Sequence, residues 1–192
     1  MIHIPSPETN WWGTEITFSG DGRRVVTTAS GGNWRNVVFS DVDTGKTSLT
    51  LTGHRSYVNA IVRFPDGKRI VTTSNDKTAK IWDATTGKEM LTLKGHGDYV
   101  SCAAVSPDGK RVVTGSRDKT ARVWDAATGE LLLTMRDFSA AVNSVDFSPD
   151  GKRIVVAVTD GTVRLYFSDA ADADAQFARR DAARNRTAVR VQ

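Results

Sequence analysis

The feature that most constrains the fold of this chain is an internal repeat of 42 residues. The pair Gly95-His96 stands 42 residues after the pair Gly53-His54. Three further landmarks of the same segment recur at this spacing, namely Asp108-Gly109 with Asp66-Gly67 and Asp150-Gly151, Trp124 with Trp82 and Tyr166, and Thr128-Gly129 with Thr86-Gly87 and Thr44-Gly45. Because all of these agree in one register, consecutive segments are expected to fold as copies of one unit that stack on each other.

The sequence pattern of each unit predicts four short β-strands. In the third unit, alternating apolar positions and turn residues place them at residues 100–105, 111–116, 120–124 and 131–135. The Asp-Gly and Thr-Gly pairs between them supply residues that tolerate positive φ, as tight hairpins require. The second unit follows the same plan over residues 58–93.

The first and fourth units depart from the pattern. The first has a longer connection between its second and third strands, SGGNWRNVV, and carries Ser40 in place of the tryptophan. The fourth has Phe138, Val156 and Tyr166 where the second and third units have histidine, threonine and tryptophan.

A period near 42 residues with Gly-His near its start and Trp-Asp near its end resembles the WD40-repeat family of β-propellers. The resemblance covers residues 12–166 and implies an all-β fold with four four-stranded antiparallel blades, forming a partial propeller or half-ring over residues 1–167. Residues 168–192 form a separate tail rich in Ala, Asp and Arg, for which a short helix and a frayed end both fit.

Composition limits the class of protein. Of 192 residues, 39% are hydrophobic and 25% charged, as is typical of a soluble globular protein. The sequence has neither an apolar run of about 18 residues that would span a membrane nor a signal peptide at its start. We therefore expect a soluble, cytoplasmic protein without membrane contact, in which the single cysteine, Cys102, is packed in an apolar strand.

The net charge of +4 is spread over the chain. Basic pairs follow the Asp-Gly turns in register, at Arg23-Arg24, Lys68-Arg69, Lys110-Arg111 and Lys152-Arg153. They would form a basic ring on one face of a propeller. We interpret them mainly as solvated turns, with nucleic-acid binding as the alternative.

Two sets of polar residues recur one period apart, namely His54, Thr72, Asp76 and Trp82, and His96, Thr114, Asp118 and Trp124. A hydroxyl, a histidine and an aspartate resemble a catalytic triad. The family resemblance instead implies a structural hydrogen-bond chain within each blade, because tryptophan only donates, carboxylate only accepts, and histidine does both. Ser74 and Ser116 are alternatives for the hydroxyl member. A site duplicated in successive repeats is unusual for an enzyme, so we expect no catalytic residues.

Metal and cofactor sites are also not expected. The chain has three histidines, His3, His54 and His96, and one cysteine, without the clustered spacing of metal ligands. Ser30-Gly31-Gly32 lacks the Lys-Ser/Thr and the helix of a phosphate-binding loop.

Three aromatic residues share one register, namely Trp12, Tyr57 and Tyr99, with Ala141 at the fourth position. The resemblance implies that this position precedes the first strand of a blade, on the face that binds partners most often. Together with the loop residues Arg55, Asn75, Asp98 and Arg117, these aromatics form a candidate partner-binding set. Packing of the rings against neighbouring blades is the alternative.

Three functional hypotheses follow. The first is a non-catalytic scaffold for protein-protein interaction that binds a protein or peptide. The second is a structural half-propeller that forms a homodimer and so closes a ring of about eight blades, with residues 2–4 as the outer strand of the partner's fourth blade. The third and least favoured is nucleic-acid binding through the basic ring.

Overall fold

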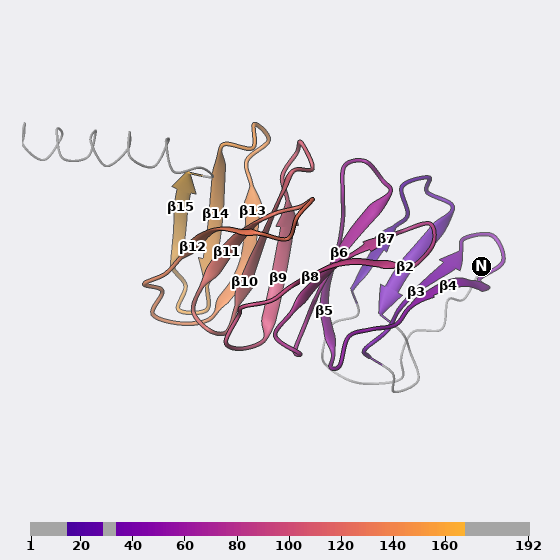
Figure 1. Ribbon diagram of the computed structural model, residues 1–192, viewed down its shortest axis with the longest axis horizontal. Coiled ribbons are helices and arrows are strands. Elements are labelled where there is room, and N and C mark those ends of the chain that lie inside the picture. The colour runs from indigo at the N-terminus through magenta and orange to yellow at the C-terminus, as the bar shows by residue number, and fades with distance from the viewer. Residues whose placement is uncertain (1–14, 29–33, 168–192) are drawn as a thin grey trace, which may run out of the picture.

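The computed structural model describes residues 15–28 and 34–167, and these residues form strands, turns and loops. Figure 1 shows four separate sheets lying side by side in chain order. The strands are β1 (Ile16–Phe18), β2 (Arg24–Thr28), β3 (Val37–Asp41), β4 (Thr47–Leu51), β5 (Val58–Arg63), β6 (Arg69–Ser74), β7 (Ala79–Asp83), β8 (Glu89–Leu93), β9 (Val100–Val105), β10 (Arg111–Ser116), β11 (Ala121–Asp125), β12 (Leu131–Met135), β13 (Val142–Phe147), β14 (Arg153–Val158) and β15 (Val163–Phe167).

Each sheet is an antiparallel meander in which consecutive strands are neighbours. The sheets comprise β1–β4, β5–β8, β9–β12 and β13–β15. The predicted all-β fold of repeated sheets is confirmed, and the third strand of the third unit begins one residue later than expected. The fourth sheet has three strands within the described range, where four were expected. Residues 2–4, the segment suggested for the outer strand, and the tail 168–192 lie outside the described residues.

Tight turns join the first two strands of every sheet. In the second sheet, Oδ1 of Asp66 accepts hydrogen bonds from the backbone N–H groups of Lys68 and Arg69, at 2.8 and 3.1 Å. Gly67 then adopts a φ of 67°, a left-handed conformation that glycine tolerates best. The Asp-Gly pairs therefore act as the turn formers that the sequence predicts.

The apolar core lies between neighbouring sheets. Phe39 and Val26 of the first sheet pack with Trp82 and Ile70 of the second. Equivalent clusters join the second sheet to the third and the third to the fourth. The first and fourth sheets lie at opposite ends of the row (Figure 1), so the described sheets form an open arc, as expected for a partial propeller.

Candidate functional site

The third sheet contains a buried chain of hydrogen bonds that runs from its third strand to its turn. Trp124 Nε1 donates to Thr114 Oγ1 at 2.8 Å, and Thr114 Oγ1 lies 2.8 Å from His96 Nε2. His96 Nδ1 lies 2.8 Å from Asp118 Oδ2. Because the carboxylate only accepts, Nδ1 carries the proton, and a neutral ring then accepts from the threonine hydroxyl at Nε2.

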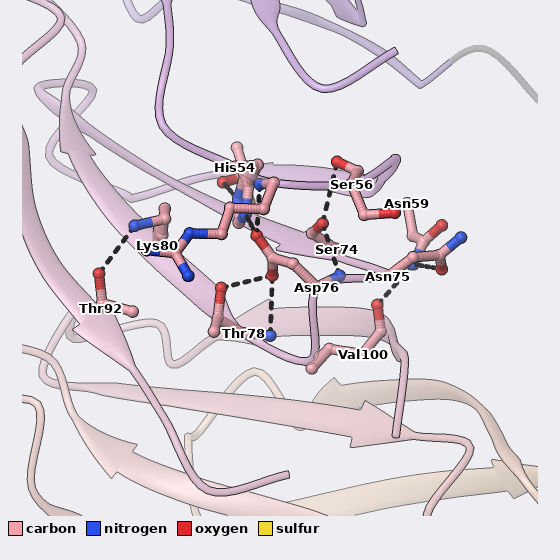
Figure 2. Close-up of polar contacts among 12 residues, drawn as sticks. His54, Ser56, Asn59, Ser74, Asn75, Asp76, Thr78, Lys80, Thr92 and Val100 are labelled. Carbon is pink, nitrogen blue, oxygen red and sulfur yellow. Dashed lines mark hydrogen bonds and ion pairs between the residues drawn. The ribbon is translucent and has the colours of Figure 1, made fainter. Parts of the chain in front are cut away.

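The second sheet repeats this chain with nearly the same distances. Trp82 Nε1 donates to Thr72 Oγ1 at 2.8 Å, and Thr72 lies 2.7 Å from His54 Nε2. His54 Nδ1 lies 2.8 Å from Asp76 Oδ2, a contact drawn in Figure 2. The structure thus brings together all four residues of each predicted set.

The two serines weighed as alternatives have other partners. Ser74 Oγ donates to the carbonyl oxygen of Ser56 at 3.1 Å and accepts from the Asp76 N–H, contacts visible in Figure 2. Ser116 makes the same contacts with Asp98 and Asp118. Threonine is therefore the hydroxyl member in both sheets, and the serines fix the turns beside it.

Burial and hydrogen bonding set the protonation of the third-sheet chain. Burial lowers the pKa of His96, helped by the nearby charge of Arg122 and opposed by the hydrogen bond to Asp118. Burial alone would raise the pKa of Asp118, but hydrogen bonds from Thr120, the Gly97 N–H and His96 outweigh it, and its pKa is lowered. His96 is thus a neutral imidazole beside the carboxylate of Asp118.

The fourth sheet replaces the chain with apolar contacts. Phe138 and Tyr166 meet edge to face, with ring centroids 5.9 Å apart, and Val156 between the strands is fully buried. Asp160 remains at the surface, where hydrogen bonds from Ser139 and Thr162 lower its pKa to about 2.

The candidate partner-binding residues lie at one end of the second and third sheets. Tyr57 precedes β5 and Tyr99 precedes β9, and the N–H groups of Asn75 and Arg117 donate to their carbonyl oxygens, both at 2.9 Å. Both tyrosines are exposed, Tyr57 by 51%. We call the six described residues of this set, Arg55, Tyr57, Asn75, Asp98, Tyr99 and Arg117, the tyrosine face. Trp12 lies outside the described residues.

Hydrogen bonds connect the loops that carry the tyrosine face to the buried His-Thr-Asp-Trp chains. Asp76 accepts from the Arg55 N–H at 2.9 Å, and Asp118 accepts from the Gly97 N–H at 2.8 Å. Asn59 Nδ2 donates both to Asn75 Oδ1 and to the carbonyl oxygen of Val100 in the next sheet, each at 2.8 Å (Figure 2). These bonds join the two loops across the gap between sheets.

Both exposed tyrosines have a partner that orients the ring. The guanidinium carbon of Arg117 lies 5.3 Å from the centre of the Tyr99 ring. The ring of Trp34 stacks on Tyr57 with centroids 6.4 Å apart and an interplanar angle of 26°. Sequence reasoning missed Trp34, although its position in the longer connection of the first unit, SGGNWRNVV, marks it as a departure from the repeat.

The basic pairs occupy the opposite strand ends, and they are not only solvated turns. Arg69 contacts Asp66 through Nε at 2.8 Å and donates from Nη2 to the carbonyl oxygen of Gly109 in the next sheet at 3.2 Å. Arg24 and Arg111 reach across in the same way, to Ala84 and Gly151. The interpretation of the basic pairs as mainly solvated turns is therefore wrong for Arg24, Arg69 and Arg111, because neighbouring sheets offer them carbonyl acceptors.

The repeat is matched by a family model described as "WD domain, G-beta repeat". The matches cover residues 45–83, 87–125 and 129–166, together more than half of the chain. The chain belongs to the WD40-repeat family. WD40 repeats are generally non-catalytic and bind protein partners, and the hydrogen-bond chains lie inside individual WD40 sheets.

Several WD40-type relatives share segments with this chain. "Nuclear distribution protein nudF 2" of Penicillium rubens is 41% identical over 56 residues, 29% of this chain and 12% of the relative. "WD repeat-containing protein 1" of Gallus gallus is 35% identical over 71 residues, 35% of this chain and 11% of the relative. "THO complex subunit 6" of Arabidopsis thaliana is 42% identical over 43 residues, 22% of this chain and 12% of the relative. The chain thus spans about a tenth of the length of these relatives.

Other groups in the WD40 sheets offer little chemistry. Burial raises the pKa of Cys102 to about 12, so its thiol is poorly reactive at neutral pH. Within residues 15–28 and 34–167, no three His, Cys, Asp or Glu side chains are grouped as metal ligands. The same part of the chain contains no helix long and apolar enough to cross a membrane.

Proposed function

We propose that this protein is a non-catalytic WD40 scaffold that binds a protein or peptide through the tyrosine face. One observation carries the proposal, namely that Tyr57 and Tyr99 are exposed at equivalent positions of adjacent sheets and are oriented by Trp34 and Arg117. Rigid aromatic rings supply contact area at low entropic cost, as binding hot spots do.

Charge on the tyrosine face favours a protein over DNA. The tyrosine face contains Arg55 and Arg117 as well as Asp98, so it carries charges of both signs. Three arginines of the opposite end are engaged with carbonyl groups of neighbouring sheets. The other members of the basic pairs are exposed, namely Arg23, Lys68, Lys110, Lys152 and Arg153. The carbonyl contacts of the three arginines weigh against nucleic-acid binding through a basic ring.

The His-Thr-Asp-Trp sets serve structure in this proposal. Thr72 and Thr114 are fully buried and each is held by two hydrogen bonds, so neither hydroxyl faces a substrate. The aspartates at the end of each set fix the backbone of the loop that carries the tyrosine. We therefore propose that the protein has no catalytic residues and needs no metal or cofactor. Its cytoplasmic location stays a prediction.

A phage-displayed random peptide library selected on the full chain supplies a defined probe. Selected peptides should bind the variant carrying Tyr57→Ala and Tyr99→Ala at least about tenfold more weakly. The matched control, Lys68→Ala with Lys110→Ala at the opposite strand ends, should bind within about twofold of wild type. Unchanged binding in the tyrosine variant, or loss in the lysine variant alone, would reject the tyrosine face as the site.

Self-association is a second candidate function. The two end sheets do not face each other in the arc (Figure 1), and each presents exposed apolar residues, among them Phe18 and Leu165. Exposed apolar sheet faces of this kind favour association with another protein surface. A mass of twice the chain in solution would support a homodimer, and a strictly monomeric mass would reject it.

A further inference from the structure

One contact recurs at every junction between sheets of this chain. An arginine at the start of the second strand donates from its guanidinium to a backbone carbonyl oxygen of the following sheet. The bonds join Arg24 to Ala84 at 3.2 Å, Arg69 to Gly109 at 3.2 Å and Arg111 to Gly151 at 3.0 Å. Arg153 holds the same position in the fourth sheet, the last sheet of the described range, and is exposed.

At the second and third junctions the acceptor is the glycine of an Asp-Gly turn, whereas at the first junction it is Ala84, directly after β7. A Cβ atom at Gly109 would lie 3.6 Å from Nη2 of Arg69, and one at Gly151 would lie 3.7 Å from Nη2 of Arg111. At Gly22, the equivalent glycine of the first sheet, such an atom would meet open space among the described residues. The first sheet thus offers a receiving turn of the same conformation, with a φ of 69° at Gly22.

The fourth sheet also exposes the apolar face that the preceding sheets bury. Val113 pairs across strands with Val123, and both are buried against the fourth sheet. The equivalent pair in the fourth sheet is Val155 with Leu165. Val123 is 0% exposed, whereas Leu165 is 55% exposed.

The first sheet exposes the matching aromatic residue. The guanidinium carbon of Arg111 lies 5.8 Å from the centre of the Phe147 ring, across the third junction. Phe18 stands at the equivalent position of β1, and it is 60% exposed where Phe147 is 7% exposed. An arginine that approached the first sheet in the way that Arg111 approaches the fourth sheet would form a cation–π contact with Phe18.

We propose that the fourth sheet of one copy of this chain docks on the first sheet of a second copy, through Arg153, Leu165 and Phe18. The proposal rests on the self-association put forward above and gives it a direction and named residues. We call the side of a sheet that packs on the following sheet its outgoing face, and the side that packs on the preceding sheet its incoming face. These two faces already fit each other at three junctions within the chain, so the occupant is a second copy of the chain. Two such head-to-tail junctions would close a ring of about eight sheets.

Sedimentation of the full chain and of two lysine variants tests this junction. Wild type is expected at twice the chain mass. Leu165→Lys damages the outgoing face and Phe18→Lys the incoming face, so each alone should sediment as a monomer, with association weakened at least about tenfold. An equimolar mixture should regain a one-to-one complex, because the intact outgoing face of the Phe18→Lys copy meets the intact incoming face of the Leu165→Lys copy.

The matched control is Leu132→Lys, which charges an exposed leucine of β12 away from both end faces and should keep the mass of wild type. Circular dichroism checks that each variant is folded, and Val163→Lys, on the same face of β15, replaces Leu165→Lys if that variant unfolds. A monomeric wild type over a wide concentration range overturns the proposal. So do single variants that keep the dimer mass, or monomeric variants whose mixture stays monomeric.

The experiments distinguish an error in this docking interface from an error in the proposed self-association or the proposed peptide binding. A dimer that survives both lysine substitutions would keep self-association and reject this interface. Peptide binding measured on Leu165→Lys and Phe18→Lys reports on the tyrosine face alone, because neither residue belongs to it. Loss of the dimer with unchanged peptide binding is the result that the proposal predicts.

Discussion

Trp124 and Thr114 are joined by a hydrogen bond of 2.8 Å in the interior of the third sheet, from the indole N–H to the hydroxyl oxygen. Thr114 is fully buried, and Trp124 is 2% exposed. The indole thus satisfies its single donor at the start of a chain that continues through His96 to Asp118. Because each member of the chain relies on the next, loss of any one leaves a buried polar group without its partner.

Asp118→Ala should therefore lower the free energy of unfolding by about 1 to 3 kcal/mol. The change removes the acceptor of His96, of the Gly97 N–H and of Thr120. Asp160→Ala in the fourth sheet should cost less, because Asp160 is at the surface and its partners Ser139 and Thr162 can bond to water. Urea denaturation of both variants measures the difference, and equal losses would reject a structural role for the third-sheet chain.

Stability should fall on mild acidification. The pKa of His96 in the folded protein lies below its ordinary value of 6.5 because the ring is buried. Between these two pKa values the unfolded chain binds more protons than the folded one, so folding is favoured above about pH 6.5 and weakened as the pH drops through it. His96→Gln should be less stable at neutral pH but lose less between about pH 7.5 and 5.5. Melting curves with the same acid dependence in both proteins would contradict this assignment.

The packing between the third and fourth sheets should tolerate no added methyl group at Gly115. A Cβ there would lie 2.5 Å from Val142 Cγ1 and 2.6 Å from Cys102 Sγ. Gly115→Ala should therefore cost about 1 to 3 kcal/mol of unfolding free energy. Gly97→Ala is the control, since its Cβ would lie 3.6 Å from the nearest atom and should change stability by less than about 0.5 kcal/mol. A stable Gly115→Ala variant would mean that these sheets pack differently.

Arg69 should stabilise the junction between the second and third sheets more than its neighbour Lys68 does. It contacts Asp66, the Gly109 carbonyl oxygen and the Phe64 ring, whose centre lies 4.1 Å from the guanidinium carbon. Arg69→Ala is expected to cost about 1 kcal/mol, and Lys68→Ala, at an exposed position, less than about 0.5 kcal/mol. Equal melting temperatures for the two variants would show that the arginine contributes nothing across the junction.

The strands could be predicted from the sequence because the repeat supplied several landmarks in one register. The Asp-Gly turns at Gly67, Gly109 and Gly151 fix the hairpins locally, and alternating apolar residues mark the strands between them. The family resemblance implied the His, Thr, Asp and Trp sets, and donor and acceptor roles place tryptophan and aspartate at opposite ends of each chain. The positions of threonine and histidine between them come from the structure, because both residues can donate and accept.

Contacts between sheets were not predictable in the same way. Trp34 and Tyr57 are 23 residues apart in sequence and belong to different units, so no local pattern predicts that their rings stack. The arginine contacts depend on the distance between sheets, which no local pattern records. Arg69 reads as a turn residue in the sequence, yet its acceptor, Gly109, is 40 residues away.

The most direct test of the account compares peptide affinity and stability in two variants. Binding of a library-selected peptide is measured by titration calorimetry, and stability by thermal unfolding, for wild type, Tyr57→Ala with Tyr99→Ala, and Thr114→Val. We predict that the tyrosine variant loses at least about tenfold in affinity and keeps the wild-type melting temperature, whereas Thr114→Val melts at a lower temperature and, while folded, binds as wild type does. A tyrosine variant that unfolds while Thr114→Val abolishes binding without destabilisation would contradict the assignment of binding to the tyrosine face and of structure to the buried chain.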